Sequence, residues 1–221
     1  MRKGWRYVSG FWQYKNLIFK HLRPSLVEVF CLNPYPLEEI NLANREVVDV
    51  GAYVGGSTIY FLSKGASKVV ALEPHPKAFE EMLVNLKLNN MLEKVVALNV
   101  ALGCSRRKVR VPSRMNMNEI WSFNAISSEG DTEVEVLTLR EILSNVEDPY
   151  LIKLDCEGCE YEVVSKFYDE LRKFEVVFIE YHSGYDQIIR TMSKDYEYQV
   201  IENPLFKNPE KQGIIKFKKR A

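Results

Sequence analysis

Two segments of this chain carry residue types and spacings that enzymes use to bind a cofactor and to move a proton. The first contains Asp49, Gly51, Gly55 and Ser57, within and just after a run of valines. A strand that ends in a glycine-rich turn before a helix can hold a ligand against its backbone. The second reads Lys153-x-Asp155-x-Glu157-Gly158-x-Glu160 and follows another apolar run. Charged side chains that converge where such strands end are candidates for acid–base chemistry.

The glycine turn favours a cofactor without a pyrophosphate. Dinucleotide-binding turns read Gly-x-Gly-x-x-Gly, and Gly51 and Gly56 fit the first and last positions. Tyr53 occupies the middle position, where the backbone must approach a pyrophosphate closely. S-adenosylmethionine (SAM) has no phosphate, and its aminoacyl end can lie over the amides of such a turn. We therefore expect the turn to hold this end through Asp49, Gly51, Ala52, Tyr53, Gly55 and Ser57.

Glu73 stands where a ribose-binding acid is expected. It follows the apolar run 68–72 and lies 24 residues after Asp49. An acid at this distance beyond a nucleotide-binding turn can accept hydrogen bonds from both ribose hydroxyls. A helix-capping role for Glu73 is the weaker alternative, because glutamate caps poorly and Pro74 follows directly. The residues expected along the adenine ring follow the next apolar run and are Asn99, Val100 and Ala101.

Asp155 is the centre of the predicted reaction site. Lys153 and Asp155 share one face of an apolar strand, where charges need partners. Glu157 follows at the same edge of the sheet, and His182 follows the neighbouring strand. We expect Asp155 to orient the amino group of the cofactor or the acceptor hydroxyl. His182 is the candidate general base because the ordinary pKa of histidine lies near neutrality. The alternative for His182 is a strand-end residue that bonds only to the backbone.

The same side chains allow a metal-assisted alternative. Asp155 and Glu157, with Glu160 or His182, could bind Mg²⁺ and activate a hydroxyl. A buried Lys153 would neutralise these carboxylates without a metal. Mg²⁺ is therefore not favoured, and no metal ligand is assigned.

Apolar runs that alternate with amphipathic stretches predict a doubly wound α/β fold. Its mostly parallel sheet has seven strands, expected near 47–50, 68–72, 94–99, 150–155, 174–180, 196–201 and 213–218. Helices are expected near 57–64, 76–88, 138–143, 161–171 and 186–192. A β-hairpin is inserted at about 104–136. We assign residues 46–221 to one domain. Residues 1–45 form an aromatic-rich segment with helices near 11–22 and 25–30, serving as a lid or a packing layer.

The balance of charges argues against a strongly charged partner. The 221 residues contain 30 basic and 30 acidic side chains, so no global field attracts nucleic acid or an anionic membrane. No apolar run is long enough to span a bilayer or to form a signal peptide. We expect a soluble cytoplasmic protein without a membrane partner, and the sequence does not predict its oligomeric state. Local basic runs lie at 106–114 and 216–220, and we interpret both mainly as solvated strand faces.

The four cysteines agree with a reducing compartment. They are too few to predict a disulfide framework in a chain of 221 residues. Cys156-x-x-Cys159 lacks a second pair or a histidine cluster that would complete a zinc site. We therefore expect both residues to act as small structural side chains rather than as a redox or metal pair.

These segments together resemble the FkbM family of class I SAM-dependent methyltransferases, over roughly residues 47–182. The resemblance rests on Asp49-Val-Gly51-Ala52, Glu73-Pro74-x-Pro76, Val100-Ala101-Leu102-Gly103, Lys153-x-Asp155-x-Glu157-Gly158-x-Glu160, and Ile179-Glu180 with His182. It implies a Rossmann-like fold, SAM as cofactor, and O-methylation of a hydroxyl on a small molecule, sugar or polyketide.

Three alternatives remain open. The region 47–90 also resembles tRNA guanine methyltransferases, but base-modifying members carry prolines where this chain reads Asp155-Cys156-Glu157. RNA contact through the basic run 106–114 with Trp121 and Phe123 is thus the less favoured reading. A SAM-binding scaffold without catalysis is the second alternative. A dehydrogenase is the weakest one because of Tyr53.

Overall fold

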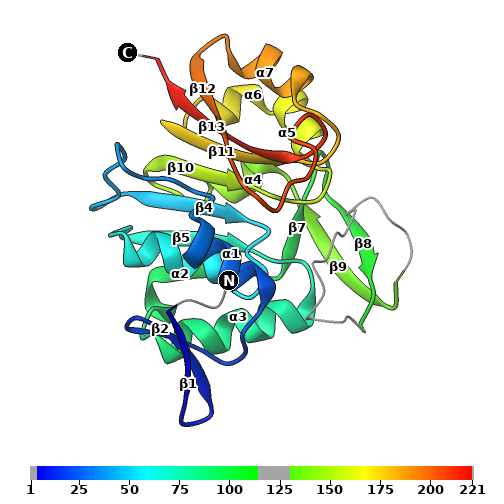
Figure 1. The fold of residues 1–221 in the computed structure, drawn as a ribbon. Coiled ribbons are helices and arrows are strands. Elements are labelled where there is room, and N and C mark those ends of the chain that lie inside the picture. Colours follow the sequence, from blue (N-terminus) through cyan, green and yellow to red (C-terminus); the bar gives the residue numbers. More distant parts are fainter. Residues whose placement is uncertain (1–3, 114–129, 221) are drawn as a thin grey trace.

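The computed structural model describes residues 4–113 and 130–220. A seven-stranded sheet in the order β12-β13-β11-β10-β4-β5-β6 forms its centre (Figure 1). The strands are β4 (Glu46–Val50), β5 (Lys68–Leu72), β6 (Val95–Leu98), β10 (Pro149–Leu154), β11 (Val176–Tyr181), β12 (Tyr196–Ile201) and β13 (Gly213–Lys219). The strands β11, β10, β4, β5 and β6 pair in parallel, whereas β13 is antiparallel to both β11 and β12. The predicted fold class is confirmed.

Helices cover both faces of the sheet. One face carries α1 (Pro24–Leu32), α2 (Gly56–Ser63) and α3 (Pro76–Leu88), and the short 3₁₀ helix η1 (Leu92–Lys94) leads into β6. The other carries α4 (Leu139–Leu143), α5 (Glu160–Lys166), α6 (Tyr168–Leu171) and α7 (Asp186–Met192). Side chains alternate between the two cores, as Val47 and Val48 do. A parallel strand buried on both faces is ordinarily apolar, so Asp49 and Lys153 in the middle of the sheet need an explanation.

A small second sheet stands beside the large one, at the right of Figure 1. It contains β7 (Val100–Leu102), β8 (Arg107–Val111) and β9 (Thr132–Leu137) in the order β7-β9-β8. β8 and β9 pair as the expected antiparallel hairpin, and β9 also pairs in parallel with β7. Arg114, Trp121 and Phe123 of the suggested RNA contact lie outside the described residues.

The N-terminal segment is not helical over residues 11–22, and this expectation was wrong. It forms an antiparallel meander of β1 (Trp5–Val8), β2 (Phe11–Tyr14) and β3 (Leu17–Phe19), at the lower left of Figure 1. Ser9 and Gly10 both have positive φ, as a two-residue hairpin turn requires. The ring of Trp5 packs against those of Tyr14 and Phe19. The aromatic spacing that suggested a helical period therefore reflects contacts between strands.

The helix expected near 25–30 is present as α1, and Pro24 is its first residue. The meander is fastened to α3. Asn89 accepts a hydrogen bond from the amide of Ile18 and returns one to its carbonyl, and Asn85 accepts from the amide of Lys20. Within residues 4–113 and 130–220, no helix is long and apolar enough to cross a membrane.

Candidate active site

A cavity lies at the edge of the sheet where β4, β5 and β10 end, and residues of α1 complete its lining. Doubly wound sheets bind their ligands at this edge. Most of the predicted site residues line it, namely Gly51, Ala52, Tyr53, Ser57, Glu73, Pro74, Val100, Ala101, Lys153, Asp155 and Glu157. Asp49, Gly55, Asn99 and His182 do not line the cavity.

The glycine turn lies tightly against the neighbouring strand. Gly51 has a φ of 74°, and a Cβ atom there would overlap the carbonyl oxygen of Asp155. The amides of Gly51 and Ala52 donate to the carbonyl oxygen of Leu72 at 3.0 and 2.9 Å, and the amide of Gly55 donates to Ala52. These three N–H groups are thus already bonded within the protein. A ligand in the cavity could therefore approach the turn without bonding to these three amides.

Asp49 is completely buried and organises the turn from behind. Its Oδ2 accepts hydrogen bonds from the hydroxyls of Ser57 at 2.7 Å and Thr58 at 2.6 Å, which ties β4 to the first turn of α2. Its Oδ1 lies 3.3 Å from Nζ of Lys153. In this structure Asp49 therefore bonds to the fold rather than facing the cavity.

Lys153 is the cation at the centre of the site. Its Nζ lies 3.2 Å from Oδ2 of Asp155 and donates to the carbonyl oxygens of Val50 at 3.1 Å and Gly51 at 2.7 Å. Burial acts to lower the pKa of Lys153, but the charges of Asp155 and Asp49 outweigh it, and the pKa is raised. The two carboxylates therefore favour the charged form of Lys153.

Glu73 lies directly after the end of β5. Its carboxylate accepts hydrogen bonds from the amides of Tyr53 at 2.8 Å and His75 at 2.7 Å. Burial raises the pKa of Glu73 to about 7, although these amides act in the opposite direction. Asn99 donates to the carbonyl oxygens of Glu73 and Pro74 and so supports the turn from outside the cavity.

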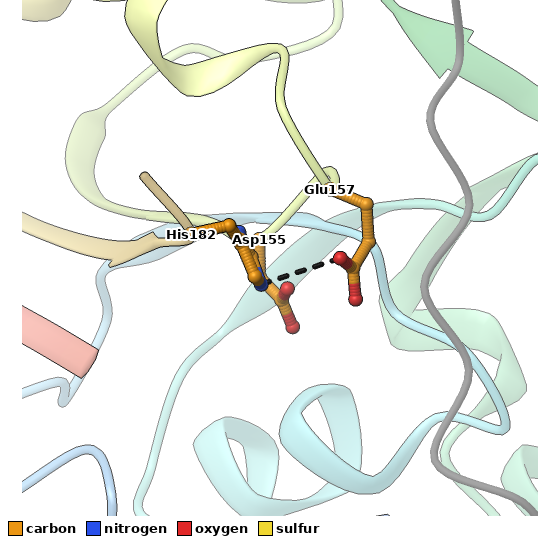
Figure 2. A group of neighbouring side chains, drawn as sticks. All are labelled: Asp155, Glu157 and His182. Atoms are coloured by element: carbon orange, nitrogen blue, oxygen red, sulfur yellow. Dashed lines mark ion pairs between the residues drawn. The ribbon is translucent and has the colours of Figure 1, made fainter. Parts of the chain in front are cut away.

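Asp155, Glu157 and His182 gather beyond the ends of β10 and β11 (Figure 2). Nε2 of His182 lies 3.3 Å from Glu157 and 3.7 Å from Glu180. Burial, together with the charges of Asp155 and Glu160, raises the pKa of Glu157 to about 8. Burial and nearby acidic charges also raise the pKa of Glu180 well above its ordinary value. The cavity edge therefore carries more carboxyl groups than fixed cations.

Glu160 supports this group from behind. It is fully buried at the start of α5, and its carboxylate accepts hydrogen bonds from the amides of Cys156 at 2.8 Å and Gly158 at 2.7 Å. Its Oε1 lies 3.7 Å from Nδ1 of His182. Glu160 thus shapes the loop that carries Glu157 and faces the rear of the imidazole ring.

Cys156 and Cys159 are joined by a disulfide bond, contrary to the expectation of two separate structural thiols. The loop between them turns back on itself, with Glu157 and Gly158 both at positive φ, and the two Cα atoms lie 5.5 Å apart. Cys156 also lines the cavity between Asp155 and Glu157. The bridge therefore restrains the loop that carries the reaction site.

The sequence analysis assigned no site role to part of the cavity wall, including Ser25, Glu28, Tyr35 and Glu180. Glu28 is an acid on an otherwise mostly apolar helix, and its carboxylate accepts a hydrogen bond from Asn203 at 2.8 Å. Burial raises the pKa of Glu28. Glu180 lies near the end of a buried strand just before His182, so the reasoning that found Asp155 would also have found Glu180. No local signal pointed to Ser25 or Tyr35.

Comparison with known proteins gives a consistent picture of the fold and family. The model of the Methyltransferase FkbM domain matches residues 49–200. The chain is 27% identical over 141 residues to the hexuronic acid methyltransferase AglP of Haloferax volcanii, and the match covers 62% of this chain and 56% of that protein. The match thus spans little more than half of the length of this relative.

Solved methyltransferase structures share the fold at low sequence identity. The methyltransferase FkbM of Methylobacillus flagellatus superimposes with a TM-score of 0.54 at 16% identity, over 79% of this chain and 43% of that one. A Streptococcus mutans protein in complex with S-adenosylhomocysteine superimposes with a TM-score of 0.52 at 13% identity, over 83% of this chain and 93% of that one. An rRNA methylase of Streptococcus thermophilus superimposes with a TM-score of 0.51 at 12% identity, over 84% of this chain and 92% of that one.

Proposed function

The chain belongs to the FkbM methyltransferase family, and from this premise we propose that it transfers a methyl group from SAM to a hydroxyl of a small molecule or glycan. The observation that carries the proposal is the cavity at the ends of β4, β5 and β10, where Glu73 stands on one side and Asp155 and Glu157 on the other. We assign cofactor binding to the side of the cavity with Glu73 and the reaction to the side with Asp155 and Glu157.

The residues present fit SAM. Gly51 lines the cavity and lets the turn pack directly against the backbone of Asp155, where a Cβ atom would overlap the carbonyl oxygen. Glu73 offers a carboxylate for the ribose hydroxyls, and Val100 and Ala101 line the same cavity with small apolar side chains suited to adenine. When bound, SAM supplies an electrophilic methyl group: the acceptor oxygen forms the new C–O bond, the C–S electron pair stays on sulfur, and the acceptor proton passes to a base of the protein.

The protein itself aligns the acceptor and accepts its proton. Alignment in a site without water supplies most of the rate enhancement in such displacements. Asp155, fixed by Lys153 at 3.2 Å, orients the acceptor hydroxyl or the amino group of the cofactor. A base with a pKa near the working pH is the most effective. We place the proton acceptor in the group formed by Glu157, Glu180 and His182, and His182 acts through the two carboxyls because it does not line the cavity.

A sugar or another polyol is the acceptor class that we favour. The related AglP is named as a hexuronic acid methyltransferase. In this chain the wall of α1 adds the hydroxyl of Ser25 and the carboxyl of Glu28 to the cavity. Such groups accept hydrogen bonds from hydroxyls.

RNA remains the less favoured acceptor. Lys108 lies 2.5 Å from Glu133, and Arg106 lies 3.7 Å from both Glu135 and Glu141. These acids offset the basic charges that would have to bind phosphates. RNA binding that weakens steeply with salt would overturn this preference.

Calorimetric titration with S-adenosylhomocysteine (SAH) tests the proposal. We expect saturable binding to the wild type and to the exposed control variant Glu93→Ala, and binding about tenfold or more weaker to Glu73→Ala, because two ribose hydrogen bonds are lost. NADH is the negative control. Preference for NADH, or no SAH binding, would overturn the proposal. SAH binding without methylation of any polyol acceptor would favour the scaffold alternative.

A further inference from the structure

Three side chains at the cavity edge have the composition and the spacing of a metal site. Asp155, Glu157 and His182 offer two carboxylate oxygens and one imidazole nitrogen, and these atoms all lie within 4.8 Å of one another (Figure 2). Ligands about 2.1 Å from one Mg²⁺ ion are about 3 Å apart when adjacent and about 4.2 Å apart when opposite. The observed arrangement therefore needs only small side-chain movements to surround one ion.

The fixed cation of the site, Lys153, pairs with one of these three ligands, Asp155. Nζ of Lys153 is shared between Asp49 at 3.3 Å and Asp155 at 3.2 Å and also donates to two backbone carbonyls. Among the described residues, no lysine or arginine forms an ion pair with Glu157 or Glu180. A metal was disfavoured because a buried Lys153 could neutralise the carboxylates. The charge of Lys153 in fact lies beside Asp49 and Asp155 and does not pair with Glu157.

The surroundings of His182 provide an independent observation. Nε2 faces Glu157 at 3.3 Å, whereas Nδ1 is buried, has no hydrogen-bond partner among the described residues and lies 3.7 Å from Oε1 of Glu160. Glu160 is fully buried and is itself fixed by two backbone amides. A histidine that binds a metal through one nitrogen ordinarily presents the other to such a carboxylate, which sets the tautomer and the ring orientation.

We propose that Asp155, Glu157 and His182 bind one divalent cation of the Mg²⁺ or Mn²⁺ class, and that the ion holds the acceptor oxygen. This second part rests on the proposed methyl transfer. Three protein ligands leave positions open for oxygen atoms of an acceptor, and Asp155 and Glu157 line the cavity in which it would lie. A hydroxyl bound to the ion loses its proton more easily.

Titration of the full chain with Mn²⁺, followed by the EPR signal of the free ion, tests the site directly. We expect one Mn²⁺ per chain in the wild type and in the exposed control variant Glu197→Gln, with Mg²⁺ competing for it. Glu157→Gln and His182→Gln should each bind Mn²⁺ about tenfold or more weakly, since even a supporting residue changes metal affinity by 10–100-fold. Equal Mn²⁺ binding by these two variants and the wild type would overturn the site.

A second measurement on the wild type does not depend on the folding of a variant. Bound Mn²⁺ is paramagnetic, so it should broaden the imidazole NMR signals of His182 before those of His21, whose Nδ1 lies 3.1 Å from Glu81 rather than beside the proposed ligands. Equal broadening of both, or no Mn²⁺ binding with SAH present, would overturn the inference. SAH binding is measured separately in EDTA. Its absence would overturn the proposed function, whereas its presence without a metal site would overturn only this inference.

Discussion

Lys153 of β10 stands directly opposite Asp49 of β4 in the sheet, and its Nζ lies 3.3 Å from Oδ1 of Asp49. Both side chains are almost completely buried, and their neighbours along each strand are apolar. Asp49 in turn holds the start of α2, and Lys153 holds Asp155. One ion pair thus joins the glycine turn to the reaction site across two adjacent strands.

Removing the cation of this pair should destabilise the whole fold. Lys153→Met leaves Asp49 buried without a counter-charge, which costs about 3–5 kcal/mol in free energy of unfolding. Urea denaturation measures the loss. The control is Lys166→Met, because Lys166 pairs with Glu162 on the exposed surface and should change stability by less than about 1 kcal/mol. A similar small loss for Lys153→Met would show that the pair contributes little.

Gly51 should not tolerate even alanine. A Cβ atom there overlaps the carbonyl oxygen of Asp155, and its φ of 74° is strained for any other residue. We expect Gly51→Ala to lower the free energy of unfolding by about 3 kcal/mol or more and to weaken SAH binding. Gly10→Ala is the matched control, because Gly10 has a φ of 87° but no atom within 4 Å of its added Cβ. We expect Gly10→Ala to cost about 1 kcal/mol, which measures the backbone strain without the overlap. Equal losses in both variants would contradict the overlap argument.

The large sheet could be predicted from the sequence because each parallel strand is a short, nearly continuous apolar run. Asp155 and Glu73 could be located for the same reason, since both follow such runs. The meander could not, because Trp5, Tyr14 and Phe19 meet only after the strands pair. The role of Asp49 was also hidden. Spacing placed it in the turn, but only packing shows that its carboxylate is bonded to Ser57 and Thr58.

Glu73 should make cofactor affinity depend on pH. Burial raises the pKa of Glu73 to about 7, and only the ionised carboxylate accepts hydrogen bonds from both ribose hydroxyls. As the pH falls through 7, protonation of Glu73 competes with SAH. The dissociation constant at pH 6 should therefore be about tenfold higher than at pH 8, with little change above pH 8.

Titration calorimetry at a series of pH values gives this profile. Glu157 also titrates near the same range, so the comparison with Glu73→Gln is needed to assign the effect. The variant should bind SAH more weakly and lose most of the pH dependence. A variant profile with the same slope as that of the wild type would assign the dependence to another group.

The disulfide between Cys156 and Cys159 should affect catalysis more than cofactor binding. It closes the loop between Asp155 and Glu160, and Glu157 in this loop holds a positive φ of 57°. Without the bridge the loop gains conformational freedom, and a bridge over so short a loop stabilises by about 2 kcal/mol in the chain-entropy description. Glu157 would then spend less time beside His182. Glu73 and the glycine turn lie outside the loop, so the cofactor side should be unaffected.

The double variant Cys156→Ser/Cys159→Ser tests this separation. We expect the methylation rate with a responsive acceptor to fall about tenfold, which corresponds to a loss of about 1.4 kcal/mol. The SAH dissociation constant should change less than about twofold. Wild-type protein treated with dithiothreitol should behave like the double variant, and treatment of the variant should change nothing. Cys104→Ser is the control, because Cys104 is a free cysteine that does not line the cavity. A double variant with the wild-type rate would mean that the backbone hydrogen bonds to Glu160 alone hold Glu157 in place.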